Sequence, residues 1–259
     1  MAEVTRHDPG QFCWSELATA DPQAAKAFYA SVFGWTTDGR PAGPASTYTT
    51  VKLRGLDVGA IYAQEREEAA RSVPPHWNVY VSVASADEAS ARARTLGGVI
   101  LAQPFEVMDA GRMAIIQDPT GAVVCAWQGR RHAGARVVDE PGAMSWCELA
   151  TTDPGRAGRF HSELFGWRLK PSGGDYTEFQ LGKRSIGGMM AITPEWGDVP
   201  SHWLTYFAVA ECDGTTRKAL KLGARARVPP RDIPNVGRFA VLIDPQGAHF
   251  AIIQLDVPA

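Results

Sequence analysis

Hydrophobic and polar positions follow the same order of patterns in each half of the chain. Residues 12–18 alternate bulky and polar side chains, which predicts a half-buried strand. Asp21 and Pro22 then supply an N-cap and a first-turn proline, and the apolar residues within 24–32 recur at helical spacing. Gly34 is placed to end that helix.

The pattern continues through the rest of the first half and recurs in the second. The predicted elements are, in order, strands near 48–53 and 58–63, a strand at 76–83, a helix at 87–96, and strands near 99, at 112–117 and at 122–128. We interpret each half as two strand–helix–strand–strand–strand modules, and the whole chain as four.

An internal repeat supports this division. Residues 14–35 match 146–167 at 12 of 22 positions, with an offset of 132. Blocks that begin at Pro74 and Gly111 match blocks that begin at Pro200 and Gly237, with an offset of 126. The first half therefore holds six extra residues, which we place in the loop at 39–47. The predicted division is a first domain at 1–128 (modules about 12–63 and 76–128), a linker at 129–142, and a second domain at 143–259 (modules about 144–192 and 202–254).

Composition narrows the class of partner. The net charge of -2 provides no attraction to nucleic acid or to an anionic membrane. Hydrophobic residues make up 45% of the chain, and no apolar run approaches the roughly 20 residues that span a bilayer. The four cysteines lack metal-site or disulfide-framework spacing. We expect a cytoplasmic protein, a monomer or dimer, with reduced thiols.

The repeated motifs carry a family resemblance. The series ELATxDPxxAxxFYxxxFGW, PxHWxxYxxV, LGG and GRxAxxxDPxG resembles the vicinal-oxygen-chelate superfamily of glyoxalases, bleomycin-resistance proteins and dioxygenases. More narrowly, it is similar to two-domain actinobacterial members labelled glyoxalase-like or hydroxylase, some of them described as kinase-associated inhibitors. The resemblance implies an α+β fold in which four βαβββ modules form two open barrels, each around a ligand cavity.

The resemblance also indicates where a metal would bind. Enzymes of the superfamily hold one divalent ion with His and Glu side chains from several strands. Counting from the two Asp-Pro motifs of each half places other residue types at the matching positions, namely Trp14, Asn78, Cys125, Trp146, Leu204 and Ala251. Because this set lacks three or four converging oxygen and nitrogen ligands, we expect no metal and no other cofactor.

Strand periodicity predicts what faces each cavity instead. Strand residues two apart share a face, so Trp14 accompanies Glu16, and Trp146 accompanies Glu148. Both carboxylates are candidate acid–base groups, although structural pairing with a Tyr or Arg is an alternative. The tryptophans are either ligand contacts or plugs of the vacant metal space. The candidate ligand-binding residues are Trp14, Asn78, Tyr80, Cys125, Trp127, Trp146, Tyr206 and His249.

Three functions remain open at this point. Aromatic cavities without metal ligands favour a binding protein that holds an aromatic or polyketide-like metabolite. A metal-independent lyase, isomerase or hydroxylase-type enzyme that uses Glu16 or Glu148 as acid or base is the alternative. A regulatory, kinase-binding role rests on the resemblance alone.

The substituted ligand positions predict metal content. We expect the purified protein to retain well below one Zn, Ni, Fe or Mn per chain after dialysis, as measured by elemental analysis. About one tightly held ion per chain would contradict this and restore a glyoxalase or dioxygenase function.

Overall fold

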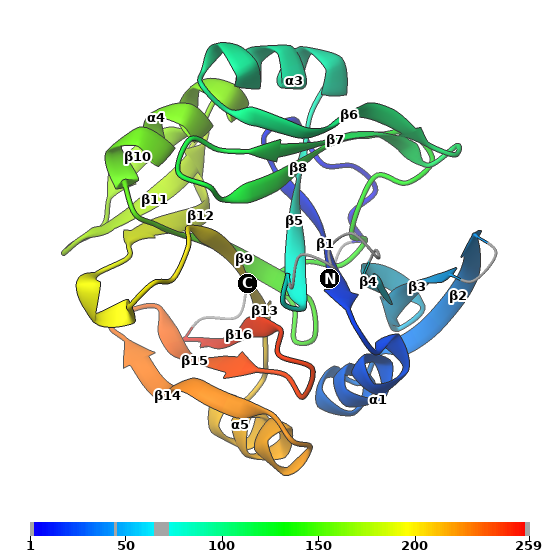
Figure 1. Ribbon diagram of the computed structural model, residues 1–259. Helices are drawn as coiled ribbons and strands as arrows, with labels where there is room; N and C mark the ends of the chain where they lie inside the picture. The colour runs from blue at the N-terminus through cyan, green and yellow to red at the C-terminus, as the bar shows by residue number, and fades with distance from the viewer. Residues whose placement is uncertain (1–2, 44–45, 65–72, 257–259) are drawn as a thin grey trace.

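The computed structural model describes residues 3–43, 46–64 and 73–256, which form two open, mixed eight-stranded sheets (Figure 1). The first sheet runs β2-β3-β4-β1-β5-β8-β7-β6, from β1 (Phe12–Thr19), β2 (Thr36–Gly43), β3 (Ser46–Leu53), β4 (Leu56–Ala63), β5 (His76–Ser82), β6 (Val99–Val107), β7 (Gly111–Gln117) and β8 (Val123–Gly129). The second runs β10-β11-β12-β9-β13-β16-β15-β14, from β9 (Met144–Thr151), β10 (Arg168–Pro171), β11 (Tyr176–Leu181), β12 (Arg184–Ala191), β13 (His202–Ala208), β14 (Arg225–Ile233), β15 (Gly237–Ile243) and β16 (His249–Leu255). The predicted duplicated α+β fold is confirmed.

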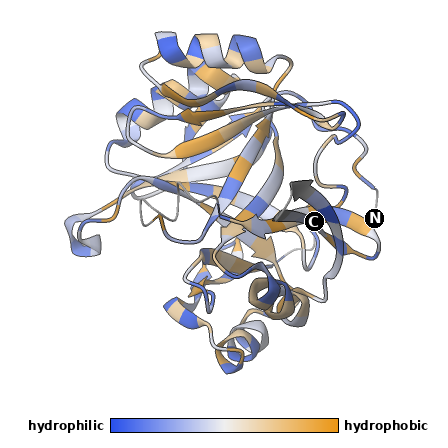
Figure 2. Ribbon diagram, turned by 45° about the vertical axis from the view of Figure 1, so that its right-hand side comes forward, coloured by the Kyte–Doolittle hydropathy of each residue, from blue (hydrophilic) through white to orange (hydrophobic). Residues whose placement is uncertain are grey.

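Each sheet joins two modules at its centre. β1 pairs antiparallel with β5, and β9 pairs in the same way with β13. Each sheet has two faces with separate apolar clusters, a small one on the concave face and a large shared one on the helix side. Figure 2 shows hydrophobic residues concentrated along the strands. We call the concave faces the first cup and the second cup.

The helices begin and end where local chemistry predicts. The Asp21 side chain accepts hydrogen bonds from the backbone N–H groups of Gln23 and Ala24, and Gly34 is left-handed with φ of 75°. The helices are α1 (Pro22–Phe33), α3 (Ala86–Thr95), α4 (Pro154–Phe165) and α5 (Cys212–Lys221), with a short 3-10 helix, η1 (Pro194–Trp196). α1 packs beside α5, and α3 beside α4, so each helix pair combines both halves (Figure 1).

Two reciprocal tryptophan contacts fix the halves in this arrangement. The Trp35 indole N–H donates to the Gly142 carbonyl at 2.7 Å, and the Trp167 indole N–H donates to the Gly10 carbonyl at 2.7 Å. Both glycines have positive φ, 92° for Gly10 and 90° for Gly142, a conformation that side chains disfavour. Such mutual contacts define an isologous interface, so the halves form a pseudo-dimer with approximate two-fold symmetry.

A second reciprocal pair connects a helix of one half to a turn of the other. The Tyr29 hydroxyl in α1 donates to Asp244 Oδ2 at 3.0 Å, and Trp77 Nε1 donates to the Tyr29 oxygen at 3.1 Å. At the matching place, His161 Nε2 lies 3.0 Å from Asp118 Oδ2, with both side chains fully buried. Asp118 and Asp244 belong to the two DPxG turns, which therefore organise the interface as well as the hairpins.

The structure corrects two expectations about the first half. Residues 36–43 form strand β2, which pairs with β3, so residues 39–43 of the predicted loop at 39–47 belong to a strand. The six extra residues also lie in two places, not in the single loop that was predicted. Trp35 precedes Tyr48 by 13 residues, against nine from Trp167 to Tyr176, so only four lie there. The other two fall between β4 and β5, a stretch that includes residues 65–72, outside the described residues.

The predicted linker packs against the first domain. Ala135 and Val137 are buried, and the Ala135 N–H donates to the Cys13 carbonyl at 2.7 Å. All four cysteines are buried and unpaired. None of the helices in the described part of the chain is long and apolar enough to cross a bilayer.

The Tyr29 contact predicts a stability effect. Tyr29→Phe removes the hydroxyl and leaves Asp244 and Trp77 each short of a buried hydrogen-bond partner, so urea denaturation should show a loss of about 1–3 kcal/mol. The surface variant Thr95→Ala, whose hydroxyl bonds to a carbonyl of its own helix, should change stability by less than about 0.5 kcal/mol. Equal values for the two variants would show that the interface contact does not stabilise the fold.

Candidate functional site

The strand register brings the predicted residues of the first half together. Trp14 pairs with Tyr80, and Tyr80 pairs with Cys125, so the three form one row across β1, β5 and β8. Glu16 and Asn78 pair in the neighbouring row. All five side chains lie on the concave side, the strand phase expected from the sequence. The first cup therefore contains its candidate residues as one cluster.

Glu16 is the hydrogen-bonding centre of the first cup. Its carboxylate accepts hydrogen bonds from the hydroxyls of Tyr80 and, at 2.8 Å, Tyr48. The Trp14 indole N–H donates in turn to the Tyr48 oxygen at 3.1 Å. Glu16 is only 8% exposed. A carboxylate this buried needs such donors, because desolvation without them costs several kcal/mol.

Burial sets the protonation of this cluster. It raises the pKa of Glu16, an effect that the hydrogen bonds from Tyr80, Tyr48 and Trp14 partly offset. Burial also raises the pKa values of Tyr48 and Tyr80 well above their ordinary value, so both hydroxyls remain donors. The Cys125 thiol pKa is raised by burial in the same way, which keeps that sulfur protonated.

Aromatic side chains fill the remainder of the first cup. Trp127 is 5% exposed, and its indole N–H donates to the His132 carbonyl at 2.9 Å. The His132 ring meets Trp14 edge-on, with centroids 4.5 Å apart. Asn78 donates to the Tyr62 hydroxyl at 3.0 Å. His132 comes from the segment after β8, so part of the predicted linker covers Trp14.

The second cup repeats the same chemistry with different partners. Tyr206 donates to Glu148 at 2.9 Å, and the Trp146 indole N–H donates to Tyr176 at 2.9 Å. Burial raises the pKa of Glu148, which the hydroxyls of Tyr206 and Tyr176 and the charge of Arg231 partly offset. Trp146, Glu148 and Tyr176 are half-buried, whereas Trp14 and Glu16 are buried. The second cup is therefore the more accessible of the two.

Two aromatic side chains of the first cup have aliphatic counterparts in the second. Met190, Leu204 and Ile253 occupy the positions that Tyr62, Asn78 and Trp127 hold in the first cup. A cavity of about 190 Å³ lies at the β11–β12 side and is lined by Asp175, Tyr176, Met190, Ala191 and Thr193. Tyr176 thus borders both the cavity and the Glu148 cluster.

One glycine makes room for Tyr176. A methyl group on Gly188 would lie 2.0 Å from the Tyr176 hydroxyl oxygen, whereas Ala60 occupies the equivalent place in β4. Tyr176 therefore approaches the backbone of β12 more closely than any side chain at position 188 would allow.

His249, which was also predicted to bind the ligand, lies at the rim of the second cup. His249 begins β16 and is exposed. Partial burial, together with the charges of His202, Arg227 and Arg225, lowers its pKa. His249 is therefore separated from the Glu148 cluster, with Leu204 between them in the same row.

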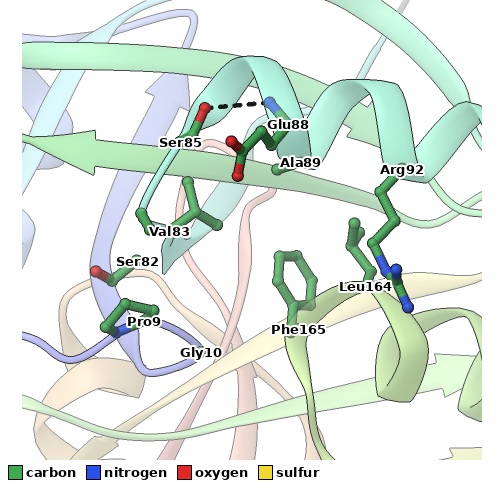
Figure 3. Close-up of a pocket in the computed structure, with 11 residues that line it drawn as sticks. Pro9, Gly10, Ser82, Val83, Ser85, Glu88, Ala89, Arg92, Leu164 and Phe165 are labelled. Atoms are coloured by element: carbon green, nitrogen blue, oxygen red, sulfur yellow. Dashed lines mark hydrogen bonds between the residues drawn. The ribbon is translucent and has the colours of Figure 1, made fainter.

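A different cavity lies between the halves. It measures about 180 Å³, and Figure 3 shows Leu164 and Phe165 of α4 facing Glu88, Ala89 and Arg92 of α3 across it. It is on the helix side of the sheets, so it shares no lining residue with either cup.

Comparison with known proteins identifies the family. Residues 14–127 and 146–253 each match the glyoxalase-like domain. The chain belongs to the glyoxalase-like domain family. This glyoxalase-like protein is 41% identical over 259 residues to CFP32 of Mycobacterium tuberculosis, provisionally named a glyoxylase, with 98% of each chain covered. It is 33% identical over 267 residues to the anthracycline biosynthesis protein DnrV of Streptomyces peucetius, with 97% of this chain and 96% of that protein covered.

Solved structures share the fold of this chain. The Mn(II)-bound glyoxalase from Novosphingobium aromaticivorans is similar with a TM-score of 0.65 and 14% identity, covering 97% of this chain and 86% of that one. An extradiol ring-cleaving dioxygenase from B. fuscum gives a TM-score of 0.67 at 16% identity, with 97% and 73% covered. At these identities, the likeness shows the fold alone.

The cups of this glyoxalase-like protein do not fit a divalent metal. Across the described ranges, no three His, Cys, Asp or Glu side chains gather in a possible metal site. The Glu16 carboxylate oxygens already accept two phenolic hydrogen bonds, and the neighbouring Cys125 is a protonated thiol. Tryptophan, leucine and alanine at the expected ligand positions supply no donor atoms for a metal.

Sequence reasoning missed several residues of the cups. Tyr48 and Tyr176 were not among the candidates, although both bond to a cup tryptophan. Tyr48 and Tyr176 are equivalent at an offset of 128. That equivalence is visible only when four of the six extra residues are placed before Tyr48 and two after β4, as in the structure. The sequence around His132 and Arg231 did not indicate a place in a cup. His132 reaches Trp14 from the segment after β8, and Arg231 lies on the edge strand β14.

The buried Glu16 predicts a pH dependence of stability. Because the pKa of Glu16 is raised in the folded state, the folded chain binds the Glu16 proton more tightly than the unfolded chain does. Protonated Glu16 therefore contributes its full share to the free energy of unfolding below the ordinary pKa of 4.5. This contribution is lost as pH rises through the folded pKa. Urea denaturation should therefore show wild type losing stability relative to Glu16→Gln from pH 4 upward.

Glu178→Gln is a control with the opposite sign. Burial raises the pKa of Glu178, but hydrogen bonds from Ser172, Ser185 and Lys170 outweigh it and lower the pKa. Wild type should therefore lose stability relative to Glu178→Gln as pH falls. Parallel curves for wild type and Glu16→Gln would contradict the assignment of Glu16.

Proposed function

We propose that the chain binds a planar aromatic small molecule in its second cup, without a metal. The observation that carries this proposal is the cluster of half-buried Trp146, Glu148 and Tyr176 with buried Tyr206, beside a cavity of about 190 Å³. Flat aromatic faces and a few directed polar groups are the usual composition of sites for such ligands.

The relatives support the ligand class. DnrV and DauV, from two Streptomyces strains, are named for anthracycline biosynthesis and are 33% and 32% identical to this chain. Anthracyclines are polycyclic aromatic compounds, so a ligand of that shape is consistent with the aromatic walls of the second cup. CFP32, which is 41% identical to this chain, carries a provisional glyoxylase name and gives no further information on the ligand class.

The two cups have different tasks in this proposal. In the first cup, Glu16 accepts one phenolic hydrogen bond at each carboxylate oxygen, and His132 and Trp127 fill the remaining space. In the second cup, Glu148 accepts a hydrogen bond from Tyr206 at 2.9 Å, the Tyr176 hydroxyl also lowers its pKa, and the carboxylate remains partly accessible. The second cup is therefore the binding site, and the first cup stabilises the fold.

An acid–base enzyme is the second candidate. Glu148 combines partial access with a pKa raised by burial, which is the state that a general acid or base near neutral pH requires. Tyr206, whose pKa is also raised by burial, would hold the carboxylate in position as a hydrogen-bond donor. Reaction and binding would then use the same cluster.

Calorimetric titration with anthraquinone-2-carboxamide tests the proposal. Wild type should bind the probe, and Trp146→Phe should weaken binding about two- to tenfold, since one aromatic contact is worth about 0.5–1.5 kcal/mol. Glu148→Gln separates the two candidates. A binder should lose the value of one hydrogen bond, about 1–3 kcal/mol, whereas an enzyme should keep affinity and lose turnover of its substrate.

The matched change Trp14→Phe identifies the working cup. A larger loss of affinity for Trp14→Phe than for Trp146→Phe would move the site to the first cup. Absence of binding by wild type would overturn the proposal for polycyclic aromatic ligands.

A further inference from the structure

The outer strands of the two sheets differ in charge at equivalent positions. β6 carries the apolar residues Val99 and Phe105, which are 54% and 43% exposed. β14 carries Arg225 and Arg231 at the corresponding places, with the offset of 126. The rest of the fold is repeated closely, so this exchange of apolar for cationic side chains is a local difference between the cups.

The register places both arginines on the concave side. Arg231 pairs with Phe239, and Arg225 pairs with Ile243. Phe239 belongs to the apolar cluster of the second cup, and residues 239 and 243 share a face because strand side chains alternate. The positive charges therefore border the second cup, opposite the cavity beside Tyr176.

In the described part of the chain neither arginine is held in an ion pair, although the charge of Arg231 also acts on Glu148. Among the residues that the structure describes, no carboxylate lies within ion-pair distance of Arg225 or Arg231. The Arg231 guanidinium lies over the Phe239 ring, with its carbon 5.1 Å from the centroid. Stacking on a ring face orients a guanidinium and leaves its N–H donors available.

Arg238 in the same half is an arginine with acidic hydrogen-bond partners, unlike Arg225 and Arg231. Arg238 is adjacent to Phe239, faces the helix side and bonds to Asp213 and Asp232. Its first-half counterpart, Arg112, makes the equivalent contacts with Asp87 and Glu106. Arg225 and Arg231 have neither acidic partners nor arginine counterparts in the first half, so the repeated architecture does not require them.

We propose that the second cup recognises a planar aromatic ligand that carries a carboxylate, with Arg231 and Arg225 binding the anionic group. This inference deepens the proposed function and rests on it. The aromatic part would lie against Trp146 and Tyr176, and the carboxylate would point toward β14. Guanidinium groups bind carboxylates through paired, charge-assisted hydrogen bonds.

The test compares two probes that differ in one group. Anthraquinone-2-carboxylate and anthraquinone-2-carboxamide share the ring system, but only the first is anionic at pH 7. Calorimetry should show the carboxylate binding wild type about tenfold or more tightly than the carboxamide, because a hydrogen bond to a charged group is worth more than a neutral one. Arg231→Gln should abolish this preference and leave carboxamide affinity within about twofold.

Arg217→Gln is the charge-matched control. Arg217 lies in α5 of the same half, on the helix side, and is exposed. This variant should retain the preference for the carboxylate, which separates local recognition from the net charge of the domain. The Arg225→Gln variant should reduce the preference as well.

The outcomes distinguish this inference from the proposed function. Equal affinity of wild type for both probes, or an undiminished preference in Arg231→Gln, would overturn anion recognition and leave aromatic binding intact. Binding of neither probe would overturn the proposed function and this inference with it.

Discussion

The need to solvate a buried carboxylate is the constraint on which each cup depends. On the concave faces Glu16 is buried and Glu148 is half-buried, so phenols supply hydrogen bonds that water does not. That requirement fixes a tyrosine on each of several strands and aligns a tryptophan beside them. The strand pairs that carry these residues must then keep one register, because a shift by one residue would turn every donor to the other face.

Duplication allowed the two cups to diverge without a change of fold. Interface contacts recur in reciprocal pairs, yet their chemistry differs, as Tyr29 with Asp244 and His161 with Asp118 show. The same holds inside the cups, where Trp127 and Tyr62 correspond to Ile253 and Met190. The first cup is therefore filled with aromatic side chains, while the second is the more open of the two.

Local signals in the sequence predicted most of the fold and part of the candidate site. Helix caps, such as Asp21 and Gly34, and the phase of the central strands depend on neighbouring residues, so they could be read directly. Strand β2, with the sequence TTDGRPAG, lacks the alternation of a strand and forms by pairing with β3 at a sheet edge, where Pro41 is tolerated. Tyr48 and Arg231 were missed because their placement depends on pairing between distant strands.

The contacts between the two halves have a consequence for how the protein folds. Each helix packs on strands of its own half, and the pairs α1–α5 and α3–α4 add contacts between the halves. Trp35 lacks its acceptor until residue 142 is in place, and Asp118 lacks its partner until α4 forms. These contacts join residues more than 40 positions apart, so the interface contributes high contact order and slows folding. During synthesis, the first half would leave the ribosome with an incompletely covered apolar surface, and the two repeats should unfold as one cooperative unit.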